Sequence, residues 1–268
     1  MRINLYRGAD MTTVTAQRQG PVLILTLEGH AVRNAIGPEV YTAITGHLTA
    51  PDPGLRAVII TGAGGYFCAG GNIQSLKASA QGTMAQATAR TDLLNTMIRA
   101  ITDCPLPVIA AIEGGAAGVG LALALACDLM VSADDAKFTL SYVKIGLSPD
   151  GGVTHFLRAA LPRQMVMDMA LRAQPVTADT FHRFGLITEL TAPDMALPTA
   201  LEIAQSLAAG PRTAQARIKH QVNIAAHNDL ATQQDLEAHD MNTARFGPEA
   251  AEGLTAFLEK RRPDFTKL

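Results

Sequence analysis

The sequence predicts an α/β fold with a helical region at its C-terminal end. Residues 55–61 and 108–112 are apolar runs typical of buried strands, and each run leads into a glycine-rich turn. From Leu197 onward the apolar spacing is helical. Repeated strand–turn–helix units followed by a helical tail indicate an α/β core, residues 1–200, and a helical C-terminal subdomain, residues 201–268.

The elements follow from local signals along the chain. Gln19-Gly20 predicts a hairpin turn, Pro38 a first helical turn, and Thr177 a helix cap. The expected strands are 14–18, 22–27, 55–61, 108–112, 128–133, 137–140 and a last one beginning at Gly185. The expected helices are one from Pro38, 79–102, 121–127, 153–173 with a break at Pro162, 177–184, 197–209, 212–227, 229–243 and 248–260.

Composition excludes several classes of protein. The chain has 268 residues, of which 48% are hydrophobic and 17% charged, and its formal net charge is −2. This composition is typical of a soluble protein with a large core, and scattered basic residues leave no electrostatic footprint for nucleic acid or a membrane surface. No apolar run reaches the ~18 residues that a transmembrane helix needs.

The cysteines and the first residues suggest a cytoplasmic protein. Cys68, Cys104 and Cys127 lie in apolar contexts without metal-ligand spacing, so we expect reduced thiols, no disulfide and no metal. The first ten residues lack the apolar region of a signal peptide. We expect a short extension there, with the compact domain beginning near Met11.

The segment 107–129 carries the strongest chemical signal. A strand, a turn built from Gly, Ala and Val at 114–120, and a helix of small residues follow one another. None of the turn's side chains ionises, so chemistry here must come from main-chain N–H groups at a helix start. Such donors form oxyanion sites, where each contributes roughly 3–4 kcal/mol to a transition state.

A second glycine turn follows the strand at 55–61. It runs through Tyr66-Phe67-Cys68-Ala69 into Gly70-Gly71-Asn72-Ile73. Two donors, one from each turn, converging on one carbonyl oxygen would stabilise an enolate. The alternative is that the glycines only permit tight packing of strands and helices.

With these two turns the chain resembles the enoyl-CoA hydratase/isomerase (crotonase) superfamily over nearly its whole length. The segments that carry the resemblance are VLILTLEGHAVRNAI, AVIITGAGGYFCAGGNI, CPLPVIAAIEGGAAGVGLALALACDL, KFTLSYVKIGLSPDGG, FGLITELT and AFLEKRRPDF. The resemblance implies a spiral of ββα units, an acyl-CoA thioester as substrate, and no cofactor besides the coenzyme A that the substrate carries. It also implies a homotrimer or a dimer of trimers.

The same resemblance implies site residues. The oxyanion hole would be the N–H groups of Gly71 and Val119. The expected contacts to substrate or coenzyme A are Arg33, Cys68, Ala69, Gly70, Gly71, Asn72, Ile73, Gly118, Tyr142 and either Lys260 or Arg261. Three positions depart from the usual family pattern: Asn72 replaces Asp, Glu113 replaces Asn, and Val119 stands within the glycine triplet.

The residues available as acid and base distinguish hydration from double-bond isomerisation. Hydratases of the family use two glutamates, and their positions here hold Ala122 and Tyr142. Alanine moves no proton, and tyrosine with a pKa near ~10 is a poor base at neutral pH. Asp150 is the remaining carboxylate in this neighbourhood, and one base suffices to shift a double bond. We therefore expect an isomerase-type proton shuttle by Asp150, unless Asp150 only caps the following helix.

Other readings remain open. A hydratase, dehydratase or C–C lyase would take its acid and base from elsewhere. A coenzyme A-binding or RNA-binding scaffold would keep the glycine turns and need no base. A dinucleotide-binding fold is rejected because neither turn has the spacing G-x-G-x-x-G.

Several residues are weaker candidates for a functional role. The polar loop from Leu76 to Arg90 is expected to shape the acyl pocket. Asp128, His155, His182 and His220 are expected to be structural or surface residues.

Overall fold

The computed structural model describes residues 11–268, so the extension expected before Met11 lies outside the described residues. Its main feature is a six-stranded sheet in the order β1-β2-β3-β4-β6-β9. These strands are β1 (Thr13–Gln19), β2 (Val22–Glu28), β3 (Ala57–Gly62), β4 (Val108–Ile112), β6 (Leu129–Ala133) and β9 (Glu189–Thr191). β1 and β2 form the predicted antiparallel hairpin, and every other neighbouring pair is parallel.

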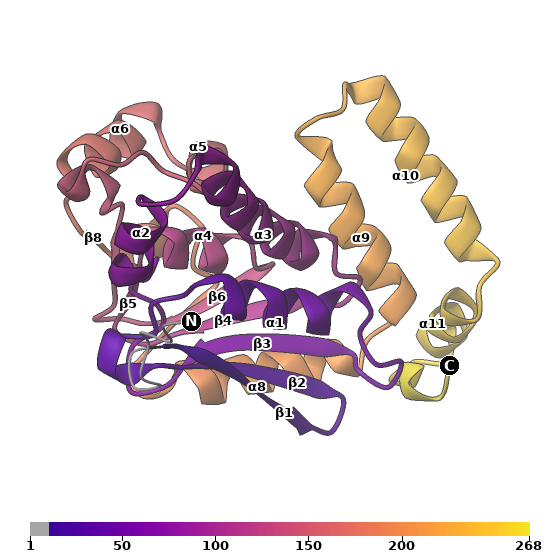
Figure 1. The fold of residues 1–268 in the computed structure, drawn as a ribbon. Helices are drawn as coiled ribbons and strands as arrows, with labels where there is room; N and C mark the ends of the chain where they lie inside the picture. Colours follow the sequence, from indigo (N-terminus) through magenta and orange to yellow (C-terminus); the bar gives the residue numbers. More distant parts are fainter. Residues whose placement is uncertain (1–10) are drawn as a thin grey trace.

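Helices cover both faces of this sheet because its central strands are apolar on both sides (Figure 1). On one face, alternate strand residues such as Val58, Ile60 and Ala110 pack with α1 (Pro38–Thr49), α3 (Met84–Asp103) and α4 (Val119–Leu125). On the other face, Ile59 and Ile109 pack against α8 (Ala196–Ala208). This two-sided burial is the pattern expected of parallel strands.

A small second sheet supports the glycine turn at 114–120. It consists of β5 (Gly115–Ala117), β7 (Lys137–Thr139) and β8 (Val176–Thr177). The expectation that 114–120 is a turn throughout is wrong for β5. A strand of three small residues has neither the length nor the β-branched side chains that normally reveal a strand.

The remaining helices connect these layers. They are α2 (Ile73–Ser79), α5 (Val153–Ala160), α6 (Arg163–Arg172) and α7 (Ala178–Arg183), with short 3-10 turns at His30–Val32, Tyr142–Ile145 and Phe265–Lys267. The break expected at Pro162 separates α5 from α6, and the Thr177 side chain caps α7 as predicted. The last strand begins at Glu189 rather than at Gly185. No helix among residues 11–268 has the length and apolar character required to span a bilayer.

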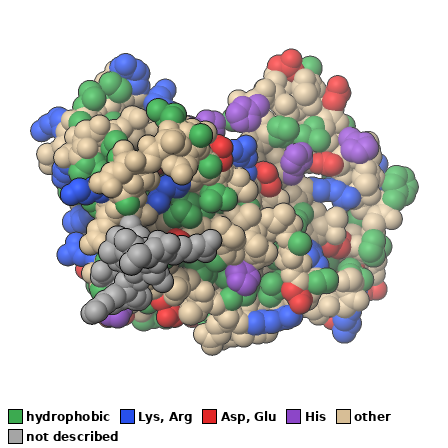
Figure 2. Space-filling model, in the orientation of Figure 1, with side chains coloured by type: hydrophobic (Ala, Val, Ile, Leu, Met, Phe, Trp, Pro, Cys, Tyr) green, Lys and Arg blue, Asp and Glu red, His purple; other side chains and the backbone are tan. Residues whose placement is uncertain are grey.

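The C-terminal helices α9 (Arg212–Ala225), α10 (Leu230–Arg245) and α11 (Pro248–Leu258) project to one side of the core (Figure 1). The predicted division at residue 200 falls inside α8, which belongs to the core, so the projecting part begins at α9. Apolar side chains lie exposed on the surface of these three helices (Figure 2). They are Ile218, Val222, Leu230, Met241, Leu254, Phe257 and Leu258.

Candidate active site

A cavity of about 240 Å³ lies where the two glycine turns meet the helices α2 and α3. Among the described residues that line it, Asp150 is the only carboxylate and Arg90 the only basic residue. The lining residues are Tyr41, Gly71, Leu76, Ser79, Ala87, Arg90, Thr91, Leu94, Val119, Tyr142, Leu147, Ser148 and Asp150. The structure therefore brings the two expected oxyanion amides and the expected base to one cavity.

The N–H of Gly71 is available for a ligand. Ile36 forms a parallel bridge with Gly71: its N–H donates to Gly70 O at 2.8 Å, and its carbonyl accepts from Asn72 N–H at 3.1 Å. In a parallel bridge the opposed residue directs its own N–H to the other side. No acceptor for the Gly71 N–H exists among the residues that the structure describes.

The N–H of Val119 is free for a different reason. Val119 is the first residue of α4, and the first N–H groups of a helix have no intrahelical acceptor. The preceding N–H, of Gly118, donates to Thr139 O at 2.9 Å, and Gly118 has a φ of 52° that fixes the helix start. Within residues 11–268 nothing accepts the Val119 N–H.

The glycines also bring the two turns into contact. A Cβ at Gly70 would lie 2.8 Å from Ala117 O, and a Cβ at Gly120 would lie 2.5 Å from Cys68 O. Ala117 N–H donates to Cys68 O at 2.9 Å, which joins the two segments directly. Tight packing and free donors thus occur together, and the packing holds both amides at one cavity.

Asp150 is half-buried and held by a tyrosine. The hydroxyl of Tyr142 donates to Asp150 Oδ1 at 2.8 Å. Burial raises the pKa of Asp150, and the hydrogen bond from Tyr142 partly opposes that rise. Burial and the negative charge of Asp150 raise the pKa of Tyr142, so the tyrosine stays a neutral donor. Asp150 is therefore an ionisable group with a stronger proton affinity than an ordinary aspartate.

Asp150 does not cap a helix. The residue at the N-terminal boundary of α5 is Gly152, and no side chain there bonds to the first turn. The alternative that Asp150 only caps this helix is therefore wrong. Gly151 lies directly over Ala122, because a Cβ at Gly151 would lie 3.1 Å from Ala122 Cβ. The backbone before α5 thus closes over the place where a hydratase-type glutamate would extend.

The segment expected to bind coenzyme A begins beside these amides. Arg33 is exposed, with its guanidinium carbon 5.6 Å from the ring centre of Tyr66. The carbonyl of Arg33 accepts from Ala69 N–H at 2.9 Å, which ties it to the second turn. Asn72 caps α2 by accepting from Ser75 N–H at 3.0 Å, and Ile73 is exposed.

Cys68 is held away from any ligand. Its side chain is completely buried, and both its N–H and its carbonyl bond to the 115–117 strand. Burial raises the pKa of its thiol to about 12. Cys68 is therefore a packing residue behind the turn rather than a nucleophile or a side-chain contact.

Lys260 and Arg261 are not brought to the cavity. Both follow α11, near the C-terminal end of the chain, and are exposed (Figure 1). Arg261 is paired with Glu252 and Glu259 at 2.6 and 2.7 Å.

The residues that were weaker candidates for a functional role make structural contacts or lie on the surface. Asp128 pairs with Lys219 of α9 at 2.8 Å and accepts from Val108 N–H at 2.7 Å. His155 stacks on His227, with ring centres 5.8 Å apart, while His182 faces the Ile187 carbonyl at 3.0 Å. His220 is exposed. Neither Asp128 nor any of these histidines lines the cavity around Asp150.

Sequence reasoning missed Tyr41, and it named Arg90 only as the end of the segment 76–90 that was expected to shape the acyl pocket; both residues line the cavity. Both lie on long amphipathic helices, where their spacing gives no sign that they face a site. Tyr41 is nearly fully buried, and burial raises the pKa of its hydroxyl. The expected polar loop at 76–90 is mostly helical, formed by the end of α2 and the start of α3.

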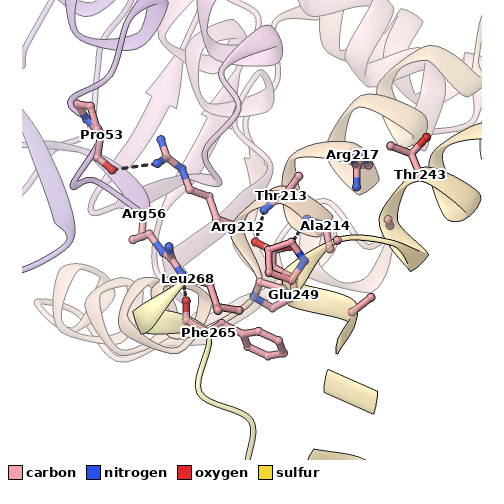
Figure 3. Close-up of a pocket in the computed structure, with 15 residues that line it drawn as sticks. Pro53, Arg56, Arg212, Thr213, Ala214, Arg217, Thr243, Glu249, Phe265 and Leu268 are labelled. Carbon is pink, nitrogen blue, oxygen red and sulfur yellow. Dashed lines mark hydrogen bonds between the residues drawn. The ribbon is translucent and has the colours of Figure 1, made fainter. Parts of the chain in front are cut away.

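A second cavity, of about 550 Å³, lies between the core and the C-terminal helices (Figure 3). Several of its polar groups make internal contacts: Arg212 donates to Pro53 O at 2.9 Å, and Arg56 donates to Phe265 O at 3.0 Å. Glu249 accepts from the N–H groups of Thr213 and Ala214. This cavity shares no lining residue with the one around Asp150.

Comparison with known proteins agrees with this geometry. The family model for Enoyl-CoA hydratase/isomerase matches residues 17–267. The chain is 33% identical to 1,2-epoxyphenylacetyl-CoA isomerase of Escherichia coli K12, covering 91% of this chain and 95% of that protein. It is 35% identical to a probable enoyl-CoA hydratase of Rhodobacter capsulatus, with coverage of 91% and 93%.

A solved structure described as an enoyl-CoA hydratase from Polaromonas sp. JS666 superposes with a TM-score of 0.92. The two chains are 39% identical, and the match covers 94% of this chain and 99% of that one. The expected superfamily and its fold are thereby confirmed. This chain belongs to the enoyl-CoA hydratase/isomerase (crotonase) family of acyl-CoA enzymes.

Proposed function

We propose that this enzyme is an enoyl-CoA isomerase in which Asp150 carries the proton. The observation that supports this most is that Asp150 is the only carboxylate, among the described lining residues, in the cavity that Gly71 and Val119 share. Its carboxylate takes a proton from C2 of a 3-enoyl thioester. The double bond moves to C2–C3, and Asp150 returns a proton to C4.

The oxyanion hole carries the charge during this shift. Loss of the C2 proton places negative charge on the thioester oxygen, and the N–H groups of Gly71 and Val119 donate to that oxygen. Two preorganised amide donors in a cavity screened from water stabilise an enolate strongly. Tyr142 positions Asp150 through its hydroxyl and lines the acyl pocket.

Isomerisation is favoured over hydration because the described residues that line the cavity include one carboxylate and not the two that a hydratase of this family uses. Adding water across a double bond requires one group to position the water and another to deliver a proton. Ala122 is covered by Gly151, and Tyr142 is a neutral donor with a raised pKa. One carboxylate suffices for a proton that leaves and returns on the same substrate.

The experiment compares 3-enoyl-CoA and 2-enoyl-CoA thioesters as substrates, with wild-type protein and Asp150→Asn. We expect conversion of the 3-enoyl to the 2-enoyl thioester, lowered about 10³-fold in Asp150→Asn, since general-base catalysis contributes about 10²–10⁴-fold. Water addition to the 2-enoyl thioester at rates above isomerisation would show a hydratase. Binding without turnover of either substrate would favour the scaffold.

Thermal unfolding of Asp150→Asn shows whether a loss of activity in this variant comes from a loss of folded protein. A raised pKa means that the folded state disfavours the charged carboxylate relative to the unfolded chain. This cost is present above the pKa of Asp150 in the folded protein and disappears as the pH falls below the unfolded pKa. The neutral amide removes it, so the variant should unfold at the same temperature as wild type or higher.

We further propose how coenzyme A and other copies complete the site. Arg33 and the backbone of Ala69, Gly70 and Asn72 would line the coenzyme A groove, with Ile73 at its edge and Gly118 beneath the thioester. Lys260 would reach the phosphates of coenzyme A bound to another copy, within a homotrimer or a dimer of trimers. The exposed apolar side chains of α9–α11 support such an assembly.

A further inference from the structure

Arg90 is the feature of the cavity that the proposed isomerisation does not use. It projects from α3, and its Nη1 donates to Ser75 Oγ at 2.6 Å. Its other terminal nitrogen, Nη2, is buried and has no hydrogen-bond partner among the described residues. A buried guanidinium nitrogen without an acceptor is costly, so such a group is normally paired.

No carboxylate among residues 11–268 serves as that partner. Asp150 lines the same cavity, and Glu39 is the acidic residue in the first turn of the neighbouring α1. Neither forms an ion pair with Arg90, although both act electrostatically on Tyr41 together with Arg90. Asp150 is already bonded to Tyr142. Arg90 therefore has no ion-pair partner in the part of the chain that the structure describes.

We propose that Arg90 binds a carboxylate on the acyl group, so that the substrate is the mono-thioester of a short dicarboxylic acid. This inference rests on the proposal that the cavity holds the acyl chain. Arginine binds carboxylates through charge-assisted hydrogen bonds, and Ser75 fixes one arm of the guanidinium while Nη2 has no hydrogen-bond partner among the described residues. The thioester end lies at Gly71 and Val119, and the carboxylate end lies at Arg90.

Binding without turnover tests the proposal directly. The probes are saturated thioesters, namely succinyl-, glutaryl- and adipoyl-CoA, each paired with the monoacid thioester of equal chain length. Wild-type protein is expected to bind at least one dicarboxylic thioester about tenfold or more tightly than its monoacid partner. Equal affinity in all three pairs would overturn the proposal, since the acyl carboxylate would then gain nothing from Arg90.

Variants of Arg90 test whether this residue causes the preference for dicarboxylic thioesters. Arg90→Met should abolish the preference for the dicarboxylic thioester and leave monoacid affinity within about threefold, while Arg90→Lys should retain part of the preference. Arg99→Met changes an exposed arginine of the same helix and should alter neither affinity. An equal loss for both thioesters in Arg90→Met would overturn the proposal, since Arg90 would then bind coenzyme A itself or only support the fold.

This test is separable from the test of isomerisation. Saturated thioesters cannot isomerise, so their affinities do not depend on Asp150 chemistry. A dicarboxylic preference without isomerase activity would leave the Arg90 assignment intact and remove the proposed reaction. Isomerase activity without such a preference would support the proposed reaction and remove the assignment of Arg90.

Discussion

At the scale of single residues, the hydroxyl of Tyr142 controls the charge of Asp150. The two side chains lie eight positions apart and meet because the 3-10 turn at Tyr142–Ile145 reverses the chain. Burial raises the pKa of Asp150, while the hydrogen bond from Tyr142 lowers it. On balance the pKa of Asp150 is raised, so its carboxylate is a stronger base than that of an ordinary aspartate.

Tyr142→Phe should move the acidic limb of the pH–activity profile to higher pH. Asp150 accepts a proton only when ionised, so kcat/KM falls as the pH drops through its pKa. The variant loses the hydrogen bond that stabilises the charged form, and the pKa rises further. The measurement is kcat/KM for isomerisation as a function of pH.

Thr91→Val is the matched control for that change. It removes another hydroxyl from the cavity lining, one that donates to Ala87 O rather than to Asp150. Its acidic limb should coincide with that of wild type. An unshifted or lowered limb in Tyr142→Phe would contradict the role assigned to the tyrosine.

Sequence reasoning at this scale reaches some residues and misses others. Asp150 and the two amide positions stand in motifs, so a local pattern locates them. The contact between Tyr142 and Asp150 depends on how a turn closes, and the exposure of Arg90 to the cavity depends on the rotation of α3. The periodicity of the local sequence predicts neither the contact nor the exposure.

At the scale of elements, the start of α4 determines whether the Val119 amide is free. Pro is tolerated at the first position of a helix because that N–H has no intrahelical partner. Val119→Pro therefore removes one proposed oxyanion donor without removing a helical hydrogen bond. We expect kcat to fall about 10²–10³-fold, the usual effect of deleting such a donor.

Val119→Ala shortens the same side chain and keeps the amide, so it reports the cost of lost packing alone. Circular dichroism and thermal unfolding establish that both variants are folded. Activities of the Pro and Ala variants within threefold of each other would count against a role for this N–H.

Sequence patterns suffice to predict the longer helices and strands but not the shortest strands. Long apolar strands and capped helices are located well, because periodicity and capping residues are local. β5 and β8 are too short for a period, and they exist because Gly115 and Phe138 find partners across the small sheet. The stretch 76–90 is polar but helical, since solvent exposure rather than irregular backbone explains its composition.

At the scale of the whole molecule, Lys219 joins the projecting helices to the core. Its side chain is only 9% exposed and pairs with Asp128, while its Nζ also donates to Ile101 O and Leu106 O. Burial raises the pKa of Asp128, and the charge of Lys219 opposes that rise. The pair thus stabilises the position of α9 against the sheet.

Lys219→Met should lower the free energy of unfolding by about 3 kcal/mol, because it leaves the Asp128 carboxylate unpaired in a largely buried place. Urea denaturation at fixed protein concentration measures this loss. Adding Asp128→Asn should recover part of it, since the unpaired charge is then gone. His220→Ala, at the exposed neighbouring position, should stay within about 0.5 kcal/mol of wild type. A loss below about 1 kcal/mol in Lys219→Met would refute the anchoring role.

The division of the molecule illustrates a limit of sequence reasoning. The four C-terminal helices are evident from their spacing, yet their spacing does not distinguish α8, which covers the sheet, from α9–α11, which project from it. The alanines of α8 face strand residues far away in the sequence. Only the folded chain shows that the core includes this helix.

In the proposed mechanism, Asp150 removes the proton at C2 while two backbone amides hold the thioester oxygen. It is tested most directly with a 3-enoyl-CoA thioester deuterated at C2, by following the loss of that label by mass spectrometry or NMR. Wild type should transfer the label to C4 or release it to solvent, and Asp150→Asn should do so about 10³-fold more slowly with unchanged substrate affinity. Loss of the label at the same rate in both proteins would contradict the account.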